Sequence, residues 1–309
     1  MFGDPAWVDL PLGSVADRQG GLVTWEQALA AGVQRSDVAF LVRRGAWERV
    51  RRGLYAEVGG DAVVRLAAAL LATGGRAVAS HGSAAELLEL DLLRETNSAV
   101  SVLTVPPGAR GHRDVPTIHV HRAGLPPRHM TESHGHPVTT VARTLVDLTR
   151  ALSLRDGVVG MDAALHAGRV NREELEEVLA DCRGWPWIRR AASAVELADP
   201  AAESPLESLS RLFFRDHDIP PPQTQVTLRS GNQFLARTDF WWESRRVAGE
   251  ADGLGKYATL ADLHAEKRRQ ERIEAQGIRV VRWTWDDIWR PAAARATAAR
   301  LRAALSWAA

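Results

Sequence analysis

The chain of 309 residues carries 39 Lys and Arg against 38 Asp and Glu, so its formal net charge is only +1. This balance excludes a protein that coats polyanions by charge alone, although it permits a locally basic site for DNA. Apolar residues at 45% and charged residues at 25% are typical of a globular protein, and the length predicts two or three domains.

The first predicted elements, within residues 21–57, are two helices followed by a hairpin. One helix is expected over residues 23–31, with Thr24 as its N-cap, and a second over residues 37–44, each ended by a glycine. Residues 46–56 then form two strands joined by a turn. This order of elements predicts a winged helix–turn–helix.

Positive charge is concentrated in this region. Six arginines lie between residues 33 and 53, against Asp37 and Glu48. In a winged helix–turn–helix the second helix enters the major groove, and the hairpin contacts backbone phosphates. A solvated basic face or a protein-docking domain is the alternative. The predicted DNA-binding residues are Arg35, Arg43, Arg44, Arg49, Arg51 and Arg52.

The region from 58 to 200 is predicted to mix helices and strands. Helices are expected over residues 61–73, 78–88, 138–149 and 171–179, strands over residues 100–107 and 117–122, and a helical bridge over residues 184–202. Five of the ten histidines lie between residues 119 and 136. No cysteine or His-Glu-x-x-His pattern accompanies them, so we expect ordinary strand and loop histidines rather than a zinc site.

Four short motifs in these two regions resemble AbiEi-type antitoxins. Gly-Val-Gln-Arg-Ser at 32–36 and Arg-Arg-Gly-Leu-Tyr-Ala at 51–56 resemble their N-terminal domain. Ser-His-Gly-Ser-Ala-Ala at 80–85 and Ala-Arg-Thr-Leu-Val-Asp-Leu at 142–148 resemble the part that follows it. The resemblance implies a DNA-binding regulator of antitoxin type.

Residues 201–309 are predicted to form a mixed sheet flanked by helices. A helix over residues 203–215, with Glu207 as its capping-box acid, precedes a hairpin. A charged helix over residues 262–276 and a strand over residues 278–285 follow the hairpin. The alternation of helices and strands predicts an α/β fold.

The hairpin, with strands at 238–242 and 247–251, carries three acids. Glu250 and Asp252 share one face of the second strand because side chains alternate along it, and pairing brings Asp239 alongside. Converging carboxylates repel one another unless a hard cation binds between them. We therefore expect Asp239, Glu250 and Asp252 to bind Mg²⁺ or Mn²⁺. Ordinary surface acids on a solvated hairpin are the alternative.

Five separated motifs in this C-terminal part resemble the very-short-patch-repair (Vsr-like) branch of the PD-(D/E)XK nucleases. They are Ser-Pro-Leu-Glu-Ser at 204–208, Arg-Thr-Asp-Phe-Trp-Trp at 237–242, Glu-Ala-Asp-Gly at 250–253, Glu-Lys-Arg-Arg-Gln-Glu-Arg-Ile at 266–273 and Gly-Ile-Arg-Val-Val-Arg-Trp-Thr-Trp at 277–285. The resemblance implies a restriction-endonuclease-like fold. It also implies a metal-activated water that attacks the scissile phosphate.

The resemblance further implies catalytic roles. Asp239, Glu250 and Asp252 would hold the metal ion. Asp252 stands where the superfamily has its catalytic lysine, so Lys256 or Lys267 is the candidate to stabilise charge on the phosphoryl oxygens. Glu207 is either a metal ligand through water or only the capping-box acid.

The sequence thus predicts a multidomain α/β protein. Its parts are a winged helix–turn–helix (1–57), an α+β middle region with a helical bridge (58–200), and a nuclease domain (201–309). The predicted function is a Mg²⁺-dependent endonuclease that the winged helix delivers to DNA in a defence, mobile-element or repair context. The alternative is a non-catalytic DNA-binding transcriptional regulator, the antitoxin of a toxin–antitoxin system.

Double-stranded DNA is the expected ligand, with a homodimer or a partner protein as a further possibility. Cys182 is the single cysteine, which excludes an internal disulfide and favours a reducing compartment. No run of 18 apolar residues or signal pattern is present. We therefore expect a cytoplasmic protein without membrane contact.

Overall fold

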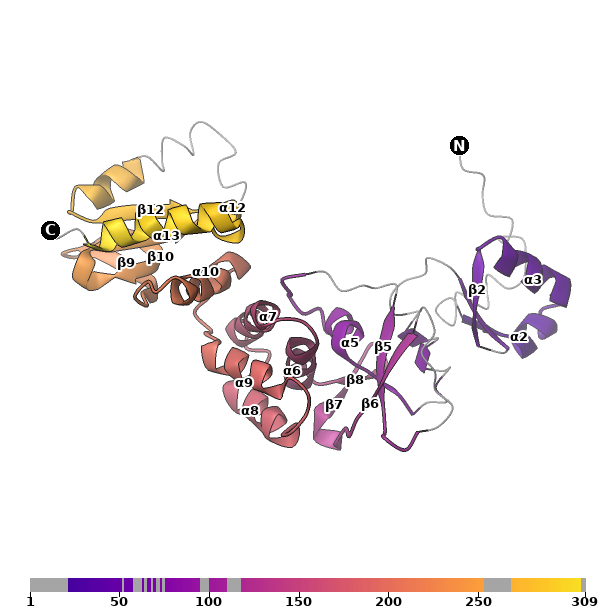
Figure 1. The fold of residues 1–309 in the computed structure, drawn as a ribbon. Coiled ribbons are helices and arrows are strands. Elements are labelled where there is room, and N and C mark those ends of the chain that lie inside the picture. The colour runs from indigo at the N-terminus through magenta and orange to yellow at the C-terminus, as the bar shows by residue number, and fades with distance from the viewer. Residues whose placement is uncertain are drawn as a thin grey trace, which may run out of the picture. The chain divides into compact units, whose positions relative to one another are not determined.

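The computed structural model of the chain divides into two compact units (Figure 1). The first comprises Met1–Leu90, Arg94–Leu152 and Glu173–Ala191, and the second Asp91–Leu93, Ser153–Arg172 and Ala192–Ala309. The predicted domain boundaries after residues 57 and 200 stay predictions. The structure describes residues 22–51, 53–57, 63, 66, 67, 69, 70, 73, 76–94, 100–109, 118–252 and 268–306. No helix in these ranges is long and apolar enough to cross a membrane.

The chain's N-terminal part has three antiparallel strands and two helices. The strands β1 (Leu22–Thr24), β2 (Trp47–Arg51) and β3 (Leu54–Glu57) form a sheet in the order β1-β3-β2. The helices α2 (Trp25–Ala30) and α3 (Arg35–Arg43) lie between β1 and β2 in the sequence. The predicted two helices and hairpin are confirmed, and β1 is an additional strand.

Local capping and apolar spacing explain these helices. Thr24 accepts a hydrogen bond from the Gln27 N–H at 3.2 Å, and the Gln27 side chain accepts one from the Thr24 N–H at 2.9 Å. Along α3, Val38 and Leu41 are three residues apart and point into a core shared with Trp47. The opposite face of α3 is therefore left to solvent.

The rest of the first unit contains a five-stranded mixed sheet in the order β6-β5-β4-β8-β7 (Figure 1). Its pairs β5–β6 and β4–β8 are parallel, and β4–β5 and β7–β8 are antiparallel. The strands are β4 (Val78–Ala79), β5 (Ser101–Val105), β6 (Ile118–Arg122), β7 (Met130–Ser133) and β8 (His136–Thr139), with a 3₁₀ turn η1 (Pro127–His129) before β7.

The helices α5 (His81–Leu87) and α6 (Val141–Ala151) belong to the first unit, as does α8 (Arg172–Asp181) apart from its first residue. The helix α9 (Ile188–Leu197) crosses the division between the two units. The helix expected over residues 138–149 is confirmed, although residues 138 and 139 belong to β8. The helix begins after Thr140, whose hydroxyl accepts a hydrogen bond from the Arg143 N–H. The hairpin β7–β8 was not predicted.

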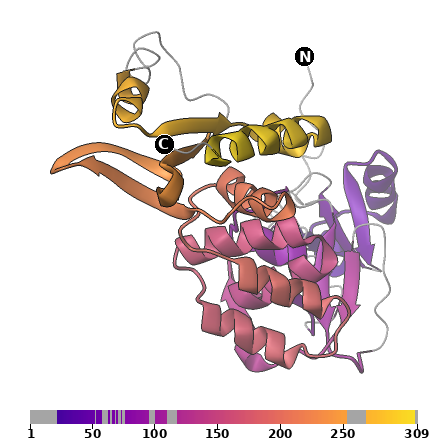
Figure 2. The same cartoon turned by 60° about the vertical axis from the view of Figure 1, so that its left-hand side comes forward.

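The second unit has a four-stranded sheet in the order β12-β11-β10-β9, antiparallel except for the parallel pair β11–β12. Figure 2 shows the β9–β10 hairpin extending from this sheet as a long ribbon. Its strands are β9 (Gln223–Ser230), β10 (Gln233–Trp242), β11 (Val247–Ala251) and β12 (Arg279–Trp283), and a 3₁₀ turn η2 (Glu243–Arg245) joins β10 to β11.

Helices accompany this sheet as the sequence predicted for an α/β fold. They are α7 (Leu154–His166), α10 (Pro205–Asp216), α12 (Trp285–Trp289) and α13 (Pro291–Ser306), and residues 268–274 are also helical. The strand expected to reach residue 285 ends at Trp283, because Thr284 caps α12.

Aromatic side chains form the core between α10 and this sheet. Phe214 contacts Phe240 and Trp283 with ring centroids 5.0 and 5.5 Å apart, and all three are almost fully buried. The Trp283 indole N–H donates a hydrogen bond to the Ser210 hydroxyl at 2.7 Å. Gly249 on β11 leaves room for the rings of Trp283 and Trp242.

We predict that Gly249→Ala destabilises the second unit. A Cβ there would lie 2.6 Å from Cη2 of Trp283 and 3.0 Å from Cζ3 of Trp242, so buried rings must shift. Such overpacking costs about 1–3 kcal/mol. Urea unfolding followed by tryptophan fluorescence measures the loss. Gly108→Ala is the control, because its Cβ meets nothing within 4 Å. Equal stability of the two variants would contradict the packing described here.

Candidate nucleic-acid interface

The acids predicted to bind a metal ion are held by protein groups. Asp239 on β10 accepts a hydrogen bond from the Ala251 N–H at 2.8 Å. The Glu250 carboxylate, which is 5% exposed, receives Nη2 of Arg269 at 2.7 and 2.8 Å and Nε of Arg282 at 2.8 Å. Strand pairing causes the second contact, because Glu250 and Arg282 are partners in the parallel pair β11–β12.

The acids Asp252 and Glu207, which were also predicted to be catalytic, contact protein groups as well. Asp252 lies 3.6 Å from Nε of Arg282. Glu207 caps the start of α10: its carboxylate accepts from the Ser204 hydroxyl at 2.8 Å and from the Glu203 N–H at 2.9 Å. These contacts hold Glu207 at the start of the helix, and its role as a metal ligand through water stays a prediction. Lys256 and Lys267 lie outside the described residues.

These contacts change the electrostatic argument made from the sequence. The carboxylates do converge near the β10–β11 pair, but guanidinium and amide groups compensate their charge. Among the described residues, no group of three or more His, Cys, Asp and Glu side chains could hold a metal ion. Binding of Mg²⁺ or Mn²⁺ stays a prediction.

A basic surface on the N-terminal part is formed by exposed arginines of α3 and β2. Arg35, Arg43 and Arg44 are exposed on α3, and Arg49 is exposed on β2. Arg35 and Arg43 are eight residues apart, which places them on one side of the helix. We call Arg35, Arg43, Arg44 and Arg49 the basic face.

Aromatic rings accompany the basic face. The Arg35 guanidinium lies 5.4 Å from the centre of the Trp25 ring, and the Arg44 guanidinium 5.4 Å from that of Phe40. A hollow of about 910 Å³ is lined by Arg35, Arg43 and Arg49 together with Trp25 and Tyr55. These contacts orient the guanidinium groups, whose planar forks match phosphate oxygens and base edges.

The six arginines predicted from the sequence are thus placed in part. Four of them form the basic face, whereas the side chain of Arg51 and all of Arg52 lie outside the described residues. The sequence analysis missed Trp25, Phe40 and Tyr55. A usable signal existed for Phe40, because it precedes Arg44 by four residues on a helix and such residues are neighbours.

Two family models match most of residues 1–200. A family described as "Transcriptional regulator, AbiEi antitoxin" matches residues 14–58, and the "AbiEi antitoxin C-terminal domain" matches residues 67–197. Two uncharacterized proteins, from two strains of Mycobacterium tuberculosis, are each 32% identical to the chain over 256 residues. Each alignment covers 83% of this chain and 92% of the relative.

These matches confirm one predicted resemblance and correct the predicted function. The AbiEi-type motifs at 32–36 and 51–56 lie within the first match, and those at 80–85 and 142–148 within the second. Both matches describe a regulator or an antitoxin, so the predicted endonuclease, with its hydrolase activity, is wrong. The motifs that suggested a Vsr-like nuclease lie beyond residue 197, outside both matches.

We predict that Glu250→Gln destabilises the protein. The amide leaves two guanidinium groups near each other without a carboxylate between them, which costs about 1–3 kcal/mol. Both arginines keep about a quarter of their side chains exposed, so the loss lies below that of a fully buried pair.

Urea unfolding without added metal measures this loss. Glu271→Gln is the control. The Glu271 carboxylate lies on the same helical segment as Arg269 and is exposed. A site built for a cation behaves in the opposite way: removing the acid relieves repulsion and keeps or raises stability. Unchanged or higher stability of Glu250→Gln would therefore contradict a structural role.

Proposed function

Because the chain belongs to the AbiEi antitoxin family, we propose that it is a DNA-binding transcriptional regulator, the antitoxin of a toxin–antitoxin pair. The observation that carries this proposal is the basic face, which lies within the segment matched by the regulator family. Duplex DNA is the proposed ligand and a toxin the proposed protein partner. A homodimer stays a prediction.

The arrangement of the N-terminal elements supports a winged helix–turn–helix. The chain passes from β1 through α2 and α3 into the hairpin β2–β3, and β3 pairs with both other strands. In proteins of this type the second helix lies in the major groove, and its N-terminal residues contact base edges. The helix α3 corresponds to that helix, and the hairpin to the wing.

The positions of the four arginines in the basic face support two different kinds of DNA contact, to bases and to phosphates. Arg35 begins α3, and its contact with the Trp25 ring holds it where a recognition helix meets base edges. Guanidinium forks bind guanine in the major groove in a bidentate manner. Arg43 and Arg44 end the helix and Arg49 lies on β2, so we assign them to backbone phosphates.

Fluorescence anisotropy with the full chain tests the proposal. The probe is a labelled duplex from the region upstream of the chain's own gene, and the comparison duplex has the same length and base composition in scrambled order. We expect at least tenfold tighter binding to the upstream duplex, as for a regulator that reads base edges. Equal affinity for both duplexes, or no binding to either, would count against a regulator of that gene.

We predict that Arg43→Glu combined with Arg44→Glu weakens binding to both duplexes and flattens its salt dependence. Each lost phosphate contact lowers the slope of log affinity against log salt by about 0.9. Anisotropy titrations between 50 and 200 mM salt, roughly the range over which phosphate contacts dominate, measure the slope.

A second double variant controls for net charge. Arg245 and Arg295 are exposed in the second unit, and reversing both changes the total charge by the same amount. Arg245→Glu with Arg295→Glu should keep the affinity and slope of the unchanged protein. If both double variants lose affinity equally, total charge and not the basic face determines binding.

A further inference from the structure

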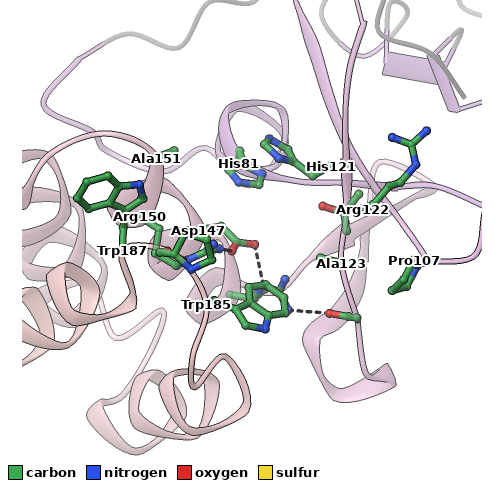
Figure 3. A pocket seen from close by; sticks show the side chains of 14 residues that line it. His81, Pro107, His121, Arg122, Ala123, Asp147, Arg150, Ala151, Trp185 and Trp187 are labelled. Carbon is green, nitrogen blue, oxygen red and sulfur yellow. Dashed lines mark hydrogen bonds and ion pairs between the residues drawn. The ribbon is translucent and has the colours of Figure 1, made fainter.

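A second cavity, of about 550 Å³, lies within the first unit and away from the basic face in sequence (Figure 3). Its walls come from the start of α5, the ends of β5 and β6, one side of α6, and the segment 185–187 that precedes α9. A cavity of this size suits one small molecule. We call it the α6 pocket.

One wall of the α6 pocket is a cluster of two guanidinium groups around one carboxylate. Arg143, Asp147 and Arg150 follow one another on one side of α6. Nε of Arg143 lies 2.6 Å from Asp147 Oδ2, and Nη1 of Arg150 lies 2.8 Å from Asp147 Oδ1. The cluster therefore keeps one positive charge.

The cluster contains a buried donor that the described residues do not satisfy. Arg143 is 1% exposed, and its Nη2 has no hydrogen-bond partner among them. Its Nη1 contacts the Gly124 carbonyl, another pocket residue, at 3.5 Å. Buried polar groups in folded proteins are nearly always paired. An open donor beside a cavity with excess positive charge indicates a site for an anion.

Flat rings form the remaining walls. The Trp185 ring centre lies 4.8 Å from the Arg143 guanidinium and 4.9 Å from that of Arg150. On another side, His81 and His121 stack with their centroids 4.1 Å apart (Figure 3). Burial lowers the pKa of His81 to about 3, so near neutral pH this ring is uncharged. Stacking surfaces of this kind accept the face of a nucleobase.

Two backbone conformations at the α6 pocket are unfavourable for their residue types. His81 has φ of 51° and Trp187 has φ of 62°, in the left-handed region. Trp187 is also 66% exposed, an unusual position for a large apolar ring. Strained residues in a folded protein gather at ligand sites. Trp187 is therefore placed to cover a ligand in the pocket.

We propose that the α6 pocket binds a nucleoside monophosphate. Its base stacks between the histidine pair and Trp187, and its phosphate contacts the guanidinium group of Arg150 while facing Arg143. The ligand is a single small molecule because the cavity holds one nucleotide, not a strand. This site is independent of the basic face and of the proposed regulation of transcription.

Isothermal titration calorimetry with the full chain tests the proposal. The probes are AMP, GMP, CMP and UMP, with the four matching nucleosides and inorganic phosphate as separate arms. We expect at least one nucleotide to bind with one-to-one stoichiometry and a Kd below about 1 mM, the range of a weak specific ligand. The matching nucleoside and phosphate alone should bind at least tenfold more weakly. No binding by any of the four nucleotides overturns the proposal.

A surface variant locates the site. Trp187→Ala should weaken binding of that nucleotide at least fivefold, and the residue is exposed, so the fold is kept. The matched control is Trp289→Ala, a change of an exposed residue of the second unit, which should bind as the unchanged protein does. Unchanged affinity of Trp187→Ala overturns the proposal.

A last variant separates this site from the DNA interface. Arg43→Glu with Arg44→Glu removes charge from the basic face and should leave nucleotide binding unchanged. If that variant loses the nucleotide, the ligand was held by the basic face and the proposal fails. If the protein fails to bind the upstream duplex but still binds the nucleotide, the regulator proposal fails and the α6 pocket stands.

Discussion

Arginine next to a buried carboxylate is the interaction on which both units depend. A buried charge is costly unless a counter-charge and hydrogen bonds accompany it. Asp162, a residue of α7 that is 1% exposed, shows the balance: burial raises its pKa to about 6, although Arg211 lies 3.0 Å away. The corresponding groups are Arg143 and Arg150 with Asp147, Arg211 with Asp162, and Arg269 and Arg282 with Glu250.

The same constraint applies to the acids of the β10–β11 hairpin. Acids at the end of a hairpin need positive charge. Arg282, on the strand β12 beside Glu250, and Arg269, on the helical segment 268–274, supply positive charge to Glu250. The same pattern of acids then serves packing of β11 against β12. The motif alone does not distinguish this use from metal binding.

Arginines outside these buried ion pairs have other surroundings. On α3 the arginines are exposed beside aromatic rings, and we propose that they contact DNA. In α6 one arginine is buried with one open donor beside a cavity. Position along a helix relative to the core therefore decides whether an arginine stabilises the fold or binds a ligand.

The sequence determined the features that depend on neighbouring residues. Thr24 is identified as a helix cap from spacing alone, and the alternation of residues 238–242 and 247–251 indicates paired strands. The AbiEi-type motifs were likewise identified from short runs of residues.

Tertiary structure decided what depends on distant residues. The strand β1 pairs with β3, which lies some 30 positions later, and Glu250 contacts Arg282, which lies 32 positions later. The α6 pocket also required Trp185 to reach Arg143. Local periodicity fixes which face a side chain occupies, but only packing of separate segments determines which charge lies opposite it.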